Sequence, residues 1–359
     1  MSGHLDSEKS KRFLRRLCLG RLKGKTIEKM PMRVGGFGIL LILLVGFMGT
    51  YFWMSYRGEH TQIPIQVKML SYHDDLLGIH QGAHSKVWVV GKNGLVLHTG
   101  DGGRNWVRQA SGTTQTLSAV SFAGERTGFV VGSGGTILST RDGGRSWSMQ
   151  SSGIKDYLLG VWAVDENRAY AVGAFGTFLS TSDGGATWMK RRFSWEKLIP
   201  RIMEETGLKV EPDLNAIQFV TPEVGWVVGE HGLVLHTRDR GQTWICQRSG
   251  NNLPQLFAVI FIDEHKGWAV GQRGTLIRTK NGGEHWLPIK LDTDRSLFGA
   301  SLEGESMVVV GERVFFRTED GGSTWARRDF TENLILTGAA LMSNSAVVVG
   351  QSGVIRRIE

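Results

Sequence analysis

The sequence predicts an all-β protein, a seven-bladed β-propeller with Gly-rich turns, preceded by one N-terminal transmembrane helix. Three observations support this fold class. An eight-residue motif of the type Thr140–Trp147 occurs six times, its closing tryptophans lie 41, 41, 56, 42 and 39 residues apart, and a Val-Gly pair occupies the equivalent position of seven units. A period near 40 residues with a fixed turn is typical of a repeat architecture in which each unit packs on the next.

The first 62 residues differ in composition from the repeats. Residues 1–33 are predicted to be a basic cytoplasmic tail, because they hold ten Lys/Arg against three acidic residues. Residues 34–54 are 21 uncharged, mostly apolar residues, about 31 Å of helix, which is enough to cross a bilayer. The positive-inside rule places residues 1–33 in the cytoplasm. No small-residue cleavage site follows the span, so we expect an uncleaved anchor, a linker at 55–62 and a propeller at 63–359.

The charge and cysteine content exclude several function classes. The tail carries ten minus three, or +7, of the net charge of +8, so the basic character indicates topology rather than nucleic-acid binding. The two cysteines, Cys18 and Cys246, lie on opposite sides of the apolar span and are not expected to form a disulfide. No ligand spacing for a metal and no cofactor motif is present, so neither is predicted.

The second repeat shows the strand pattern of a unit. Strands are expected at 117–122, 128–132 and 136–140, with a fourth starting at Trp147. Glycine-rich turns of two to four residues between such strands are typical of antiparallel hairpins.

A column of bulky residues stands three positions before the glycine of each Val-Gly pair. It consists of Trp88, Phe129, Tyr170, Trp226, Trp268, Val308 and Val347. We expect this column to pack one blade on the next rather than to bind a ligand.

The seventh unit, 336–358, ends after its third strand. The segment 63–69 (IPIQVKM) has the pattern of a strand and precedes the first unit. The simplest closure of the ring makes 63–69 the outer strand of the last blade, which would leave no open sheet edge.

The recurring motif resembles the Asp-box of BNR-type propellers, in which the turn joins the third and fourth strands of a blade. The resemblance assigns a structural role to the residues at its acidic position, which are Asp101, Asp142, Asp183, Asp239, Asn281 and Asp320. The carboxylate is expected to accept N–H bonds within the turn, and glycine supplies positive φ. Two copies depart from the pattern, one through Asn105 and one through Asn281 and His285.

Strand order divides the loops between two faces. First-to-second and third-to-fourth turns share one face with every Asp-box, while second-to-third turns and the linkers between blades share the other. This second face carries an insertion at 189–213 that accounts for the 56-residue spacing, with a helix expected near 195–205 that Pro200 restricts or kinks. The insertion either docks a protein partner or caps the central channel. The candidate partner-binding residues are Lys190, Arg191, Arg192, Trp195, Arg201, Glu230, His231, Arg273 and Arg313.

One hypothesis for the function is an enzymatic, sialidase-like glycan-active propeller, because Asp-boxes also occur in sialidases. Within the predicted propeller at 63–359 the chain has only Tyr72, Tyr157 and Tyr170 as candidate tyrosine nucleophiles, and it has no arginine-containing signature of that family. His98 and His236 occupy equivalent strand positions, which suits the surface rather than a metal pair. No catalytic residue and no small-molecule substrate is predicted.

Over 76–358 the repeat resembles the photosystem II stability/assembly factor family, most faithfully at 226–244. The resemblance implies a non-enzymatic, seven-bladed scaffold outside the cytoplasm that binds a membrane protein complex during assembly. Relatives also occur in non-photosynthetic bacteria. Cys18 precedes the apolar span instead of following it, so no lipoprotein signal is present. We therefore expect a single-pass protein of the bacterial inner membrane with a periplasmic propeller and a membrane-protein partner, for example a transporter. A photosystem II assembly factor in a photosynthetic organism is the alternative.

Overall fold

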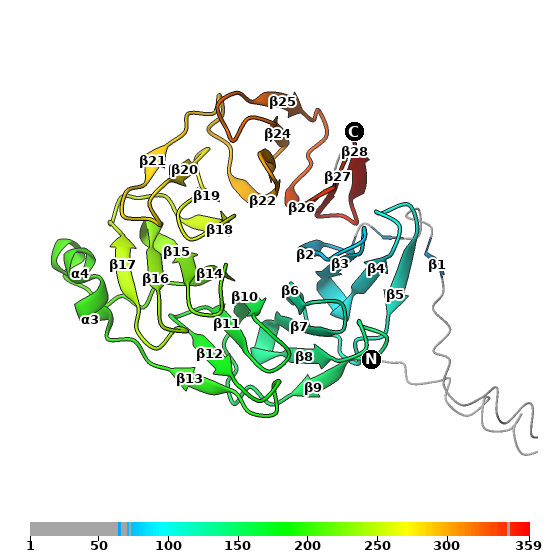
Figure 1. Ribbon diagram of the computed structural model, residues 1–359, viewed down its shortest axis with the longest axis horizontal. Coiled ribbons are helices and arrows are strands. Elements are labelled where there is room, and N and C mark those ends of the chain that lie inside the picture. Colours follow the sequence, from blue (N-terminus) through cyan, green and yellow to red (C-terminus); the bar gives the residue numbers. More distant parts are fainter. Residues whose placement is uncertain (1–63, 66–69, 72, 343–344) are drawn as a thin grey trace, which may run out of the picture. The chain divides into compact units, whose positions relative to one another are not determined.

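Seven antiparallel sheets follow one another around a central axis in the computed structural model, which describes residues 64–65, 70–71, 73–342 and 345–359 (Figure 1). The predicted seven-bladed propeller is confirmed. The predicted tail, membrane span and linker at 1–62 lie outside the described residues. Within the described ranges, no helix is long and apolar enough to cross a membrane.

Each blade is a meander that runs from the central axis outwards. Blade 1 comprises β2 (Leu76–Gln81), β3 (Val87–Gly91), β4 (Val96–Thr99) and β5 (Trp106–Gln109), and blade 2 comprises β6 (Leu117–Ala123), β7 (Thr127–Gly132), β8 (Ile137–Thr140) and β9 (Ser148–Gln150). Blade 3 comprises β10 (Leu158–Ala163), β11 (Ala169–Gly173), β12 (Phe178–Thr181) and β13 (Met189–Arg191), and blade 4 comprises β14 (Leu214–Phe219), β15 (Gly225–Gly229), β16 (Val234–Thr237) and β17 (Ile245–Arg248). Blade 5 comprises β18 (Leu256–Phe261), β19 (Gly267–Gly271), β20 (Leu276–Thr279) and β21 (Leu287–Pro288), and blade 6 comprises β22 (Leu297–Glu303), β23 (Ser306–Gly311), β24 (Val314–Thr318) and β25 (Ala326–Asp329). Blade 7 comprises β26 (Leu336–Met342), β27 (Ser345–Gly350) and β28 (Ile355–Ile358).

The N-terminal strand β1 (Pro64–Ile65) pairs with β5 of the first blade, Pro64 opposite Val107 and Ile65 opposite Trp106. The expectation that this segment completes the last blade is therefore wrong for its described part. Its alternating pattern predicts a strand but does not say which of two neighbouring open edges it joins. The first and last blades are instead joined by packing and by bonds such as that from Thr337 Oγ1 to the Leu76 carbonyl, at 2.7 Å.

The interfaces between blades hold the core, with one hydrophobic cluster at each of the seven junctions. The junction of blades 4 and 5 is representative. Trp226 is fully buried, stacks on Phe261 with ring centroids 3.6 Å apart, and donates from Nε1 to the carbonyl of Gly282 at 3.2 Å. Gly282 lies in the Asp-box of the next blade. All seven residues of the predicted column are buried, which confirms that they pack blade on blade.

The Asp-box turns have the bonding expected of them. The Thr140 hydroxyl donates to Asp142 Oδ1 at 2.7 Å, and Asp142 accepts the Ser146 N–H at 3.0 Å and its hydroxyl at 2.6 Å. In the first copy, bonds from the Asn105 N–H and the Thr99 hydroxyl outweigh partial burial and lower the pKa of Asp101 to about 2. The asparagine copy keeps the turn, because Asn281 Oδ1 accepts from the Thr279 hydroxyl and the His285 N–H, each at 3.0 Å.

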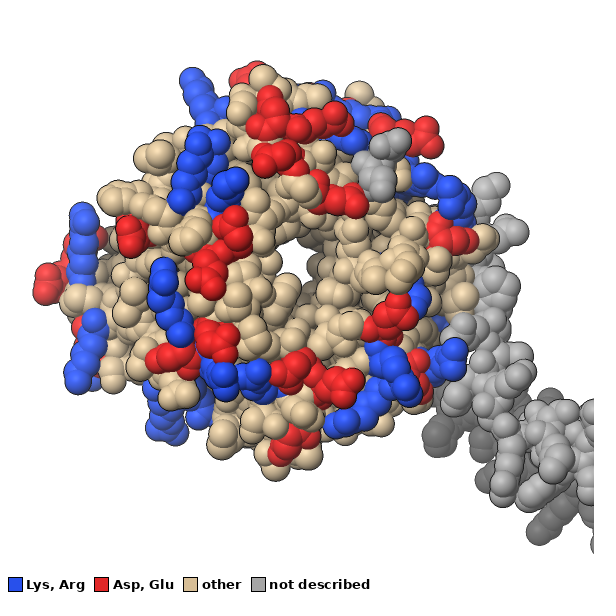
Figure 2. Space-filling view, in the orientation of Figure 1, with Lys and Arg blue, Asp and Glu red and all other residues tan. Residues whose placement is uncertain are grey.

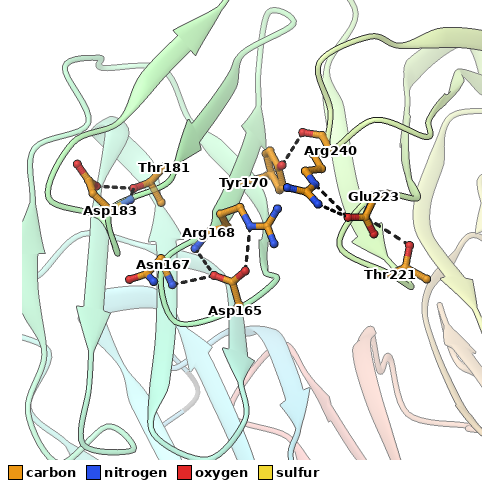
Figure 3. A network of polar contacts seen from close by, with 9 residues as sticks. All are labelled: Asp165, Asn167, Arg168, Tyr170, Thr181, Asp183, Thr221, Glu223 and Arg240. Carbon is orange, nitrogen blue, oxygen red and sulfur yellow. Dashed lines mark hydrogen bonds and ion pairs between the residues drawn. The ribbon is translucent and has the colours of Figure 1, made fainter.

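The fourth Asp-box departs from the pattern in a way that the sequence analysis missed. Arg240 occupies the position of the first glycine and has φ 64°. Its carbonyl accepts the Tyr170 hydroxyl of blade 3 at 2.6 Å, and its guanidinium bonds to Glu223 Oε1 (Figure 3). A left-handed residue costs roughly 1–2 kcal/mol, and the bond to Tyr170 of blade 3, together with the bond to Glu223 within blade 4, offsets part of that cost.

Candidate protein-binding face

The two faces of the propeller are built from different loops, as predicted. On the box face the Asp-box turn of a blade meets its first-to-second turn, with the Gly143 N–H bonded to the Arg126 carbonyl at 2.9 Å. On the linker face the second-to-third turn meets the linker to the next blade, with the Gly135 N–H bonded to the Asp156 carbonyl at 3.0 Å. Equivalent bonds occur in the other blades, so the two sets of loops stay on separate faces around the ring.

Every second-to-third turn on the linker face has one residue at its apex with positive φ. These seven apex positions, called the turn tips below, are Asn93, Gly134, Phe175, His231, Arg273, Arg313 and Ser352, with φ between 54° and 65°. Asparagine and glycine adopt this conformation readily, whereas a bulky side chain there is an outlier. Blades 7, 1 and 2 carry small tips, and blades 3 to 6 carry Phe, His, Arg and Arg. Large side chains at strained positions of four successive blades indicate a functional surface.

The large tips present different chemistry to solvent. The Phe175 side chain is 69% exposed, and its N–H donates to Asp213 Oδ1 at 2.8 Å. Arg273 is exposed and donates only to the Asn252 carbonyl at 3.2 Å, while half-buried Arg313 donates to the Phe330 carbonyl at 3.4 Å. Among the described residues neither guanidinium forms an ion pair with a carboxylate.

Of the predicted partner-binding residues, His231, Arg273 and Arg313 are thus turn tips. Glu230 stands next to the His231 tip, and its carboxylate accepts the Asp213 N–H at 3.0 Å. Phe175 was missed, although its place in the second-to-third turn of blade 3 matches that of His231 in blade 4.

The insertion forms α3 (Trp195–Leu198) and α4 (Pro200–Thr206), with Pro200 starting the second helix as the predicted kink requires. Both lie at the outer rim of the ring beside β16 and β17 (Figure 1), and Ile199 and Ile202 are buried in the cluster between blades 3 and 4. The insertion therefore does not cap the channel, which is open in Figure 2. Trp195 is only 5% exposed, so it anchors the insertion and cannot be the partner contact that we expected.

Three of the four basic residues of the insertion that were predicted to bind a partner are already engaged within the fold. Lys190 bonds to Asp156 at 2.9 Å, Arg191 to the Gln242 carbonyl at 2.6 Å, and Arg201 to Glu205 at 2.7 Å. Arg192 is exposed. Figure 2 likewise shows acidic and basic side chains interspersed around the ring on the face in view.

The central channel has a volume of about 560 Å³, and its mouth on the linker face is lined by both apolar and polar residues. The mouth consists of the second residue of each inner strand. Leu77, Leu159, Phe257 and Phe298 are apolar there, and the two phenylalanine rings lie 5.2 Å apart. The polar members bond across to the next blade, as Asn215 does to the Leu256 carbonyl at 2.7 Å. The mouth therefore combines four apolar side chains with three polar ones, Ser118, Asn215 and Thr337.

The tyrosines and the histidine considered for catalysis or metal binding, where they are described, are wholly or partly buried within the fold. Tyr170 is buried with its hydroxyl bonded to Arg240, burial raises the pKa of Tyr157, and Tyr72 lies outside the described residues. His236 is buried and stacked on Trp226, so its assignment to the surface was wrong. In the described ranges no group of three His, Cys, Asp or Glu side chains is placed to hold a metal.

Comparisons with solved structures show the same fold. YCF48 from Cyanidioschyzon merolae is 22% identical, with a TM-score of 0.67 over 82% of this chain and 98% of that chain. A structure of YCF48 bound to D1 peptide is 19% identical, with a TM-score of 0.62 over 83% and 94%. The GH74 xyloglucanase from Xanthomonas campestris is 11% identical, with a TM-score of 0.61 over 81% of this chain but 52% of that chain. A comparison with curated proteins finds no match.

The family assignment comes from the sequence itself. The family model described as photosynthesis system II assembly factor YCF48 matches residues 150–256 and 249–358, which together exceed half of the chain. These residues include the Asp-boxes of blades 3 to 6 and the four large turn tips. The chain therefore belongs to the photosystem II assembly factor YCF48 family.

Proposed function

We propose that the protein is a membrane-anchored, non-enzymatic scaffold whose linker face binds a segment of an integral membrane protein and helps to assemble or stabilise its complex. The observation that carries the proposal is the set of large turn tips on blades 3 to 6. The solved structure of YCF48 bound to D1 peptide supports it, because a propeller of this fold binds a peptide in that structure. The apolar span at 34–54 supports anchoring, with the propeller in the periplasm of a bacterium.

Crosslinking in native membranes, followed by mass spectrometry of the material captured with the full chain, tests this function. We expect one membrane protein complex, for example a transporter, to be enriched with the wild type. Capture of soluble proteins alone would contradict the proposal.

A second candidate is assembly of photosystem II itself, which the relative bound to D1 peptide favours. The same capture experiment separates the two. Enrichment of D1 from a photosynthetic source would establish the second candidate, and enrichment of an unrelated membrane complex the first.

The orientation of the anchor has its own test. Ser352 is exposed on the linker face. In a Ser352→Cys variant that also carries Cys246→Ser, a membrane-impermeant maleimide added to spheroplasts should label position 352 without lysis. Labelling only after lysis would place the propeller in the cytoplasm.

A further inference from the structure

The central channel, which is open in Figure 2, is lined by uncharged residues. Although 21% of the chain is charged, none of the residues along the channel is Asp, Glu, Lys or Arg. Its one titratable residue is His80, and burial lowers the pKa of this imidazole to about 4, so the ring is neutral at neutral pH. A charged group of a ligand would lose its hydration there without an opposite charge to pair with, which is costly. The channel therefore suits a neutral ligand.

The innermost strand of every blade ends its sheet, so the backbone N–H and C=O groups of its free edge face the channel. Each of these strands also has a β-bulge at its second residue, where the register against the neighbouring strand shifts. A bulge redirects the side chain and interrupts the regular spacing of the backbone groups. The free edges thus offer donors and acceptors, but no regular ladder that an added peptide strand could continue.

Aromatic rings stand at both ends of the channel. At the mouth on the linker face, Phe257 and Phe298 are half-buried and their ring centroids lie 5.2 Å apart. Towards the box face the channel is lined by Trp162, the fifth residue of β10, which is also half-buried. The indole N–H of Trp162 has no hydrogen-bond partner among the described residues. An aromatic ring with a free N–H binds a ligand that has both an apolar face and hydrogen-bond acceptors.

Polar side chains of the channel keep hydrogen-bonding capacity for a ligand. The Ser118 hydroxyl donates to the Leu158 carbonyl at 2.6 Å, so its oxygen remains an acceptor. Towards the box face, Gln81 accepts the Ser301 hydroxyl at 3.4 Å, and its amide NH₂ has no partner within the described ranges. A neutral sugar matches this lining, because its hydroxyl groups both donate and accept and its C–H face packs on an aromatic ring.

We propose that the central channel binds a neutral oligosaccharide. One sugar ring packs on Trp162, and the hydroxyl groups bond to Gln81, Ser118 and the free edges of the innermost strands. The channel volume of about 560 Å³ lies within the range of about 300–1,000 Å³ that is usual for ligand pockets. This inference goes beyond the proposed function, because the sugar occupies the channel whereas the membrane partner contacts the turn tips.

Two variants test the site in different ways. Trp162→Leu removes the aromatic surface. Leu159→Trp narrows the channel at its mouth, where the leucine is half-buried and lines open space, and it carries the test if Trp162→Leu does not fold. Leu208→Trp is the matched control, because it places the same side chain at a position of the insertion that is 66% exposed.

Isothermal titration calorimetry of the full chain, in a detergent without a sugar headgroup, measures the binding. The neutral probes are maltotriose, cellotriose and triacetylchitotriose, and sialyllactose is the charged one. We expect a neutral trisaccharide to bind with an affinity that changes less than twofold when the salt concentration is raised tenfold, because no charge is involved. Trp162→Leu and Leu159→Trp should each weaken this binding at least tenfold, and Leu208→Trp should bind like the wild type.

Four results would overturn the inference. They are no binding of any neutral trisaccharide, tighter binding of sialyllactose, tighter binding of an uncharged Gly-Ser peptide, and equal binding by wild type and Leu159→Trp. Capture of the membrane partner is measured separately. If the wild type captures the partner but binds no sugar, the proposed function stands and this inference fails. If it binds sugar in the channel but captures no membrane partner, the proposed function fails and this inference stands.

Discussion

The two faces of the propeller meet the same backbone requirement with different residues. Each Asp-box turn on the box face needs positive φ at two positions, and glycine fills all of them except that of Arg240. Each turn on the linker face needs positive φ at its tip, and only Gly134 among the seven tips is glycine. Six of the seven linker-face turns also have a glycine at positive φ directly after the tip. The contrast with the box face therefore concerns the tips alone, and it lies in what their side chains do.

On the box face the exception is explained inside the fold. Arg240 bonds to Glu223 and its carbonyl holds Tyr170 of the neighbouring blade (Figure 3). On the linker face Phe175 and Arg273 extend into solvent and form few contacts within the chain. Strain that the fold does not compensate indicates function, so we place stability on the box face and recognition on the linker face.

The largest effect should come from removing an aromatic residue that bridges a blade to the next Asp-box. Trp226→Ala deletes a fully buried ring and its bond to the Gly282 carbonyl, and such truncations cost about 3–5 kcal/mol. Phe175→Ala, on the linker face, should change the free energy of unfolding by less than about 1 kcal/mol. Urea denaturation followed by tryptophan-independent circular dichroism measures both. Equal losses would remove the distinction between the faces.

A pH titration tests the buried histidine of blade 4. His236 is 3% exposed, and burial, with a smaller effect of Arg238, lowers its pKa to about 4. The unfolded chain then binds more protons than the folded chain between pH 6.5 and 4, so stability is full above pH 6.5 and falls towards pH 4. The loss should be on the order of 1–3 kcal/mol. His236→Gln should reduce this slope, and part of it should remain because burial also lowers the pKa of His80, to about 4, and that of His98. An unchanged slope in His236→Gln would assign the loss to other groups.

Removing one Asp-box carboxylate should have a smaller effect. Asp142→Ala leaves the Ser146 N–H and the two hydroxyls of its turn without their acceptor, which we expect to cost about 1–2 kcal/mol. Asn281→Ala, in the box that lacks the carboxylate, is the matched comparison and should cost less. Differential scanning calorimetry of the two variants provides the measurement, and a larger loss for Asn281→Ala would contradict the role given to the charge.

The Arg240 exception predicts the smallest changes. Tyr170→Phe removes one interblade hydrogen bond and should cost about 1 kcal/mol. Arg240→Gly relieves the left-handed conformation but loses the Glu223 contact, so its net effect should stay within about 1 kcal/mol of zero. A gain in the free energy of unfolding well above that value would show that the fold does not compensate the left-handed conformation of Arg240, as at the linker-face tips. Arg240 would then require a functional explanation on the box face too.

The fold could be predicted from the sequence because the repeat specifies it many times over. The Asp-box, the Val-Gly pair and the buried column each recur with one period, and the loop faces then follow from strand order. The pairing of β1 with β5 could not be predicted, since the sequence pattern of a strand does not specify which strand it pairs with. The rim position of the insertion could not either, because amphipathic helices suit a cap and a buried anchor equally.

The candidate site was only partly predictable. The sequence analysis named the linker face and three of the four large turn tips as candidates, but it also named Trp195, which is buried, and it missed Phe175. Aligning the turns on their glycines places Phe175 where Asn93 and Gly134 stand, a position that favours small residues. The same alignment of the Asp-boxes would have shown Arg240 in place of glycine. Conformational conflicts between aligned repeats are therefore the signal to search for.

The division of roles between the faces is tested most directly by photocrosslinking from single positions in native membranes. A photoreactive amino acid is placed either at Phe175 on the linker face or at exposed Arg145 in the Asp-box of blade 2. Both variants should fold like the wild type, because both side chains are solvent-exposed. We predict that position 175 crosslinks to a membrane protein and position 145 does not. Crosslinking from position 145 alone would contradict the account.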